Sequence, residues 1–185
     1  MSDIVLRQRI VMVSGALIVL LALGAALLPL SDTLAPRVVI GTMLLAAGAL
    51  ELLSALMLQA HRPAMSIAGG ATILAALRLL LDPRAGFFPV LNLVILWLVV
   101  RAAALAFAAW RSKDPLQSWL IFSSAADFLL AVGLLAGMPI AYLVVGLFGP
   151  TQPIVGTFAW VFALSFITTG AALIATSRLE FRQPD

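Results

Sequence analysis

Four ionisable residues lie inside long apolar runs of this 185-residue chain: Glu51, Arg78, Arg101 and Asp127. A charged side chain costs about 2.5–3.5 kcal/mol at the centre of a membrane helix, so each of them needs a physical reason to be there. Buried carboxylates and guanidinium groups pair with one another, and such pairs act as helix-packing contacts, proton relays or ion-coupling sites. These residues are the candidates for chemistry.

Depth along each run separates the four residues into two groups. At a helical rise of about 1.5 Å per residue, Glu51, Arg101 and Asp127 each lie about 12–15 Å from the inner end of their runs, near the bilayer middle. We therefore predict an inward-facing Glu51–Arg101 pair that Asp127 joins. Arg78 lies only about 7 Å from the outer end of its run at Pro83, so its side chain can extend outward to the interface.

The predicted Glu51–Arg101–Asp127 cluster has two interpretations. In the first, the charges neutralise each other and fix the packing of the helices. In the second, the cluster is a proton- or ion-responsive centre, in which the carboxylates are the groups that respond to acid. The sequence leaves both interpretations open.

Other chemistry lacks the residues it needs. The chain has no cysteine, and its one histidine, His61, lies in a short polar break beside Arg62. The one lysine, Lys113, also lies in a predicted loop, so neither a Ser–His nor a Ser–Lys pair is available within the spans. No zinc-type ligand spacing is present. We predict a protein that is not an enzyme and has no metal site and no cofactor.

The amino-acid composition indicates an integral membrane protein. Hydrophobic residues make up 63% and charged residues 10% of the chain, with a mean hydropathy of +1.15, whereas a soluble domain carries about 25% charged residues. Length allows a single membrane domain, residues 1–185. The net charge is +3, but the basic residues occur in ones and twos rather than in a continuous stripe, which argues against nucleic-acid binding.

Each crossing of the hydrocarbon core needs about 20 apolar residues. The apolar runs that meet this length extend over roughly 10–30, 38–59, 64–81, 88–110, 116–137 and 154–177. We predict an all-α polytopic membrane protein whose six transmembrane helices form three hairpins, over residues 10–60, 64–110 and 116–177. Residues 140–149 are apolar but too short to cross, and we expect a re-entrant or interfacial segment there.

Three prolines end the odd-numbered runs at nearly constant spacing. Pro83 follows Pro29 by 54 positions, and Pro139 follows Pro83 by 56. Each of these runs also contains a pair of small residues near its start: Ser14-Gly15, Gly69-Gly70 and Ser123-Ser124. A fixed period of this size indicates one unit used three times, and a two-span unit gives parallel copies.

The three copies are GALIVLLALGAALLPL with AAGALELLSAL, GATILAALRLLLDPR with WLVVRAAALAF, and SSAADFLLAVGLLAGMP with SFITTGAALIA. A glycine-rich helix that ends in proline, followed by a helix with a small-residue turn and one polar residue, resembles the HdeD family of small bacterial membrane proteins. The resemblance covers nearly the whole chain and implies a six-helix protein associated with resistance to acid stress. It implies no catalytic residues. Leu98 departs from it, since the other copies have Gly48 and Gly170 there.

Basic residues predict the orientation. With the N-terminus inside, the inner segments hold seven of them and the outer loops only Arg37 and Arg84; the inner ones are Arg7, Arg9, Arg62, Arg111, Lys113, Arg178 and Arg182. This excess predicts that both termini face the cytoplasm, in the inner membrane of a bacterium.

Three functional hypotheses follow. The first is a non-enzymatic inner-membrane protein that contributes to acid or envelope stress tolerance, as the HdeD resemblance implies. The second is a small proton, ion or solute transporter or channel that uses the Glu51–Arg101–Asp127 layer. The third is a structural subunit of a larger membrane complex. The expected partner is the lipid bilayer, with a homo-oligomer or a membrane-protein partner left open.

Overall fold

The computed structural model describes residues 2–27, 36–58, 62–81, 87–113, 116–136 and 153–179. The described residues form six helices, and each contains a span long and apolar enough to cross a membrane. The helices are α1 (Ser2–Leu27), α2 (Pro36–Met57), α3 (Arg62–Leu81), α4 (Phe87–Trp110), α5 (Leu116–Leu135) and α7 (Pro153–Leu179). The protein is therefore an all-α polytopic membrane protein, which confirms the predicted fold class. The segment 140–149, His61 and the three repeat prolines lie outside the described residues.

Helix formation follows from the apolar composition, because a backbone inside lipid must satisfy its own hydrogen bonds. Pro36 and Pro153 are the first residues of α2 and α7, a position where the missing proline N–H has no helical partner to lose. Helix α1 begins at Ser2, earlier than the apolar run that starts near residue 10. Arg7 and Arg9 end the apolar pattern without ending the helix, since charged side chains are compatible with a helix that extends beyond the hydrocarbon core.

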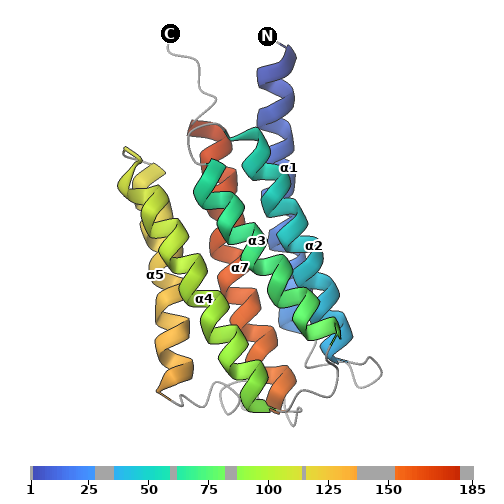
Figure 1. The fold of residues 1–185 in the computed structure, drawn as a ribbon. Helices are drawn as coiled ribbons and strands as arrows, with labels where there is room; N and C mark the ends of the chain where they lie inside the picture. The colour runs from blue at the N-terminus through green and yellow to red at the C-terminus, as the bar shows by residue number, and fades with distance from the viewer. Residues whose placement is uncertain are drawn as a thin grey trace.

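The six helices form a closed arrangement in which sequence neighbours lie side by side and α7 returns to pack against α1 (Figure 1). The most extensive contacts are α1 with α7, α2 with α3, and α4 with α5. Each of these pairs joins two different predicted hairpins. Helix α7 also contacts α2 across the bundle. Within the apolar stretch of its span 61% of the residues are buried, the largest share among the six spans. The start of α1 and the end of α7 lie at the same end of the bundle (Figure 1).

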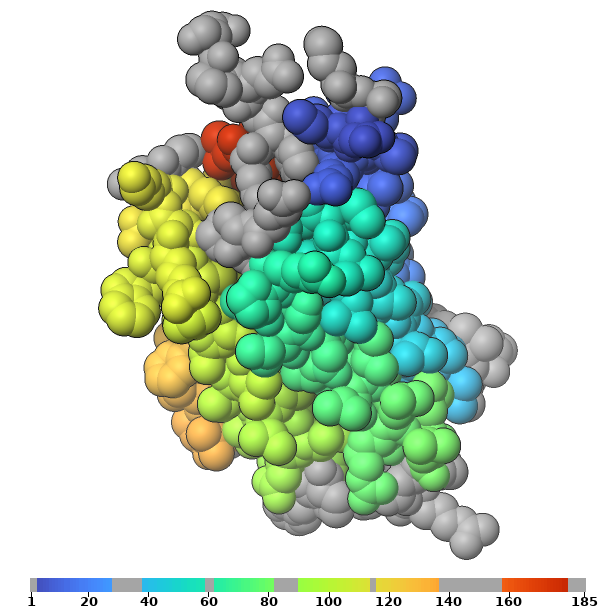
Figure 2. Space-filling view, turned by 45° about the horizontal axis from the view of Figure 1, so that its top comes forward, coloured from blue at the N-terminus to red at the C-terminus, as the bar shows by residue number. Residues whose placement is uncertain are grey.

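The outer surface of the bundle is apolar, as contact with lipid requires. Helices α2, α3 and α4 lie side by side and present one continuous face (Figure 2). Large aliphatic side chains point outward from each part of the bundle, among them Leu20, Leu74, Leu96 and Leu129, which are 62–69% exposed.

Glycines allow the closest helix contacts. A methyl group added at Gly15 in α1 would lie 2.8 Å from the carbonyl oxygen of Gly170 in α7. A methyl group at Gly69 in α3 would lie 3.0 Å from the backbone nitrogen of Leu52 in α2. Small residues at such positions let membrane helices pack backbone against backbone. These two contacts hold together two of the three most extensive helix pairs.

Candidate functional site

Arg101 lies at the centre of the bundle and contacts both candidate carboxylates. Its Nη1 donates to Oε1 and Oε2 of Glu51 at 2.6 and 2.8 Å, and its Nε donates to Oδ2 of Asp127 at 3.2 Å. Arg101 and Asp127 are completely buried and Glu51 is 4% exposed. The structure therefore brings together the three residues predicted from depth. We refer to Glu51, Arg101 and Asp127 as the buried charge cluster.

Hydroxyl groups from neighbouring helices complete the hydrogen bonding of the buried charge cluster. Arg101 Nη1 also donates to Thr72 Oγ1 at 2.9 Å, and Arg101 Nη2 donates to Thr169 Oγ1 at 2.6 Å. Ser165 Oγ donates to Asp127 Oδ1 at 2.5 Å. The network thus joins side chains of α2, α3, α4, α5 and α7, five of the six described helices, in a single hydrogen-bonded unit.

Thr72 connects the network to a buried indole. Its hydroxyl oxygen accepts from Trp97 Nε1 at 3.1 Å as well as from Arg101. Its single hydroxyl hydrogen faces two acceptors at 3.0 Å, Oε2 of Glu51 and the carbonyl oxygen of Ala68 one turn back in α3. The hydroxyl group can therefore donate to either acceptor by rotating, with no movement of the α3 backbone.

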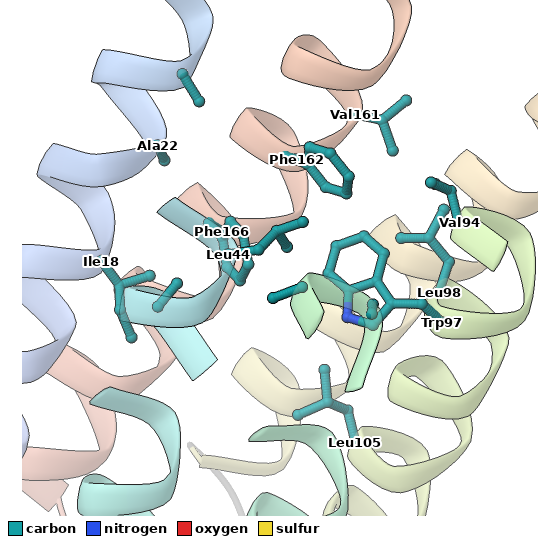
Figure 3. Packing of buried hydrophobic residues seen from close by; sticks show 14 of the residues in the cluster. Ile18, Ala22, Leu44, Val94, Trp97, Leu98, Leu105, Val161, Phe162 and Phe166 are labelled. Atoms are coloured by element: carbon teal, nitrogen blue, oxygen red, sulfur yellow. The ribbon is translucent and has the colours of Figure 1, made fainter. Parts of the chain in front are cut away.

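Aromatic rings cover one side of the guanidinium group. Arg101 Cζ lies 5.2 Å from the ring centroid of Trp97 and 5.3 Å from that of Phe166, within the range of cation–π contacts. Phe162 packs edge-on against Trp97 with centroids 5.1 Å apart (Figure 3). The rings shield the buried charge and give it a favourable electrostatic partner on that side.

An apolar pocket lies between α1, α2 and α7, and Phe166 is one of the residues that line it. The same ring contacts the guanidinium group of Arg101. The other lining residues are Leu21, Ala25, Ile40, Met43, Leu44 and Phe162. The lining is apolar, and the described residues place no charged group in it.

The remaining sequence candidate, Arg78, is not part of the buried charge cluster. It is exposed in the last turn of α3, as expected of a side chain that extends toward the interface. Sequence reasoning missed Thr72, Ser165 and the position of Trp97 over the cluster. One signal was available: Trp97 and Arg101 are four residues apart, as are Ser165 and Thr169, so each pair lies on one helix face.

The described residues contain no group of three histidine, cysteine, aspartate or glutamate side chains that could hold a metal ion. The buried charge cluster offers instead a permanently charged guanidinium group shared by two carboxyl groups. Such an arrangement can bind or release a proton and can hold helices in register. The predicted lack of enzyme activity stays a prediction.

No protein-family model matches the chain, and no curated protein and no solved structure matches it either. The class of protein is therefore defined by the fold and the site: an all-α membrane protein whose described part has six helices able to span a membrane and a buried charge cluster that joins five of them. The resemblance to the HdeD family stays a prediction.

Proposed function

We propose that the chain is a non-enzymatic membrane protein, similar in role to the HdeD family, that contributes to tolerance of acid or envelope stress. The observation that carries the proposal is the enclosure of the buried charge cluster. Its guanidinium group and both its carboxyl groups have hydrogen-bond partners inside the bundle, and none of its three side chains is more than 4% exposed. The polar groups are used to hold the bundle together rather than to bind a substrate in this conformation.

Acid tolerance suits such an interior. The only carboxyl groups among the described residues are those of Asp3, Glu51 and Asp127. The last two contact an arginine that stays charged at any external pH, so the transmembrane part presents few exposed acidic groups to the outside. A bundle of this kind keeps its packing as the external pH falls.

We place the protein in the inner membrane of a bacterium, with both termini in the cytoplasm. The excess of basic residues in the segments that would then be inside supports this orientation. The common end of the bundle at which α1 begins and α7 ends is consistent with termini on one side of the membrane (Figure 1).

The proposal is tested in the host bacterium after deletion of the gene. Cells complemented with the wild type, or with the exposed-site variant Arg78→Met as a matched control, are expected to survive an acid challenge better than the deletion strain. A fluorescent protein fused after Asp185 reports both the amount of protein and a cytoplasmic C-terminus. Equal survival of deleted and complemented cells, at normal protein levels, would exclude the stress role.

A second candidate is a small proton or ion transporter, and one observation favours it. Two carboxyl groups share one arginine in the interior of the bundle, and intramembrane ionisable residues commonly mark ion and proton pathways. Transport would require a second conformation in which water reaches the buried charge cluster.

Proteoliposomes distinguish the two candidates. A transporter is expected to show proton or ion flux when the external pH falls, and Glu51→Gln or Asp127→Asn is expected to abolish this flux while the protein remains folded. Arg78→Met serves as the control that leaves the buried charge cluster intact. Absence of flux in the wild type would remove the transporter candidate and leave the stress-tolerance proposal standing.

A further inference from the structure

The formal charges of the buried charge cluster do not balance. Two carboxylates and one guanidinium group give a net charge of −1 when all three are ionised. Every other charged residue of the described part of the chain lies toward an end of its helix or just beyond it. These residues are Asp3, Arg7 and Arg9 on α1, Arg37 at the start of α2, Arg62 and Arg78 on α3, Arg111 and Lys113 just after α4, and Arg178 on α7. Arg78 comes nearest in sequence to the network, but it is exposed six residues, or about 9 Å along α3, from Thr72.

An uncompensated charge in the apolar interior of a membrane protein is removed by proton binding rather than kept. We propose that the buried charge cluster is a proton-binding site that holds one proton at neutral pH, on Asp127, in a hydrogen bond shared with Ser165 Oγ. Proton binding forms one O–H bond on Asp127 and changes the formal charge of the cluster from −1 to 0. The inference goes beyond the stress-tolerance proposal and does not depend on it.

The hydrogen bonds assign the proton to Asp127 rather than to Glu51. Both oxygens of Glu51 face Arg101 Nη1 at 2.6 and 2.8 Å, and the Thr72 hydroxyl adds a donor at 3.0 Å. Short, charge-assisted donors of this kind stabilise the ionised form. Asp127 accepts from Arg101 through Nε alone, at 3.2 Å. Glu51 is therefore the better partner for the guanidinium group, and the proposed proton is assigned to Asp127.

Ser165 is the group that makes a protonated Asp127 stable. Its hydroxyl lies 2.5 Å from Asp127 Oδ1, and both atoms are completely buried. A hydroxyl group can accept as well as donate, so the same pair of atoms keeps its hydrogen bond when Oδ1 carries the proton. Thr169 is engaged elsewhere, since its oxygen accepts from Arg101 Nη2 at 2.6 Å and its hydroxyl donates to the carbonyl oxygen of Ser165 at 2.9 Å.

Infrared spectroscopy of the full chain in lipid vesicles at neutral pH tests the assignment. The wild type is expected to show the C=O stretch of one protonated carboxyl group, and this band is expected to shift when aspartate, but not glutamate, carries ¹³C in its side-chain carboxyl. Absence of the band would show that both carboxyl groups are ionised and would overturn the proposal. A band that shifts with labelled glutamate would place the proton on Glu51 and would also overturn it.

Three variants are expected to change the C=O band in ways that a purely structural role of the buried charge cluster would not explain. Asp127→Asn removes the band with the acid itself. Glu51→Gln is expected to remove it as well, because Arg101 then balances Asp127 alone and no proton is needed. Ser165→Ala is expected to keep the band at a higher frequency, as loss of a hydrogen bond strengthens the C=O bond. A band that survives Glu51→Gln unchanged would contradict the charge-balance argument even with the isotope result in place.

Discussion

Replacement of Arg101 by methionine is expected to lower the free energy of unfolding by about 3–5 kcal/mol, the cost of removing one partner from a buried ion pair. Methionine fills most of the volume but supplies no donor, so Glu51 loses its charged partner and Asp127 loses the hydrogen bond from Nε. Thr72 and Thr169 also lose a hydrogen bond each. The stability is measured by denaturant titration of the purified protein in detergent micelles, followed by the helical circular dichroism signal.

Two comparisons distinguish the loss of the buried ion pairs from the effect of exchanging arginine for methionine. Arg78→Met removes the same chemical group from an exposed position and is expected to change the stability by less than about 1 kcal/mol. The triple replacement Glu51→Met, Arg101→Met, Asp127→Leu removes all the charges together and is expected to recover most of the loss, since a buried ion pair exchanged for apolar groups is often neutral or stabilising. If Arg101→Met costs no more than Arg78→Met, the buried charge cluster does not hold the bundle together.

The sequence was sufficient to predict the depth of the buried charge cluster in the bundle, because that depth depends on local helix geometry alone. The helical rise is fixed, so counting residues from the end of a run gives the depth of Glu51, Arg101 and Asp127 without any knowledge of how the helices pack. The cost of burying a lone charge then requires that they meet. The same reasoning placed Arg78 near a helix end, where the structure shows it exposed.

The hydroxyl groups that bond to the buried charge cluster depend on packing between helices, which the sequence does not encode locally. Thr72 and Ser165 are ordinary residues in apolar helices, and only the rotation of α3 and α7 turns their hydroxyl groups toward Arg101 and Asp127. The return of α7 to α1 is likewise invisible in the sequence, because Gly15 and Gly170 belong to opposite ends of the chain. Glycine is common throughout these helices, so its presence alone does not identify the contact.

The sequence does not show which of the adjacent glycines Gly69 and Gly70 makes a close helix contact, since the two residues are chemically identical. In the structure the two glycines have different surroundings. A methyl group at Gly69 would lie 3.0 Å from the Leu52 nitrogen and 3.1 Å from Cβ of Glu51, whereas one at Gly70 would meet no atom within 4 Å. The backbone of α3 at Gly69 thus packs against the residue that carries one of the two buried carboxyl groups.

Gly69→Ala is therefore expected to destabilise the protein by about 1–3 kcal/mol, the usual cost of an added methyl group in a closely packed contact. The backbone nitrogen of Leu52 cannot turn aside as a flexible side chain can, so α2 must shift, and Glu51 shifts with it away from Arg101. Gly70→Ala is the matched control and is expected to be neutral or stabilising by up to about 1 kcal/mol, because alanine favours the helix over glycine. Denaturant titration of both variants in the same micelles checks the difference.

The outcome of the glycine pair bears on the buried charge cluster as well as on packing. If Gly69→Ala acts by displacing Glu51, its cost should shrink in the background of the triple apolar replacement, where no charged contact remains to be lost. An undiminished cost in that background would show that the α2–α3 contact and the charge cluster stabilise the bundle independently. Equal effects of Gly69→Ala and Gly70→Ala would instead contradict the close approach of the two helices at Gly69, and with it the positioning of Glu51 by the backbone of α3.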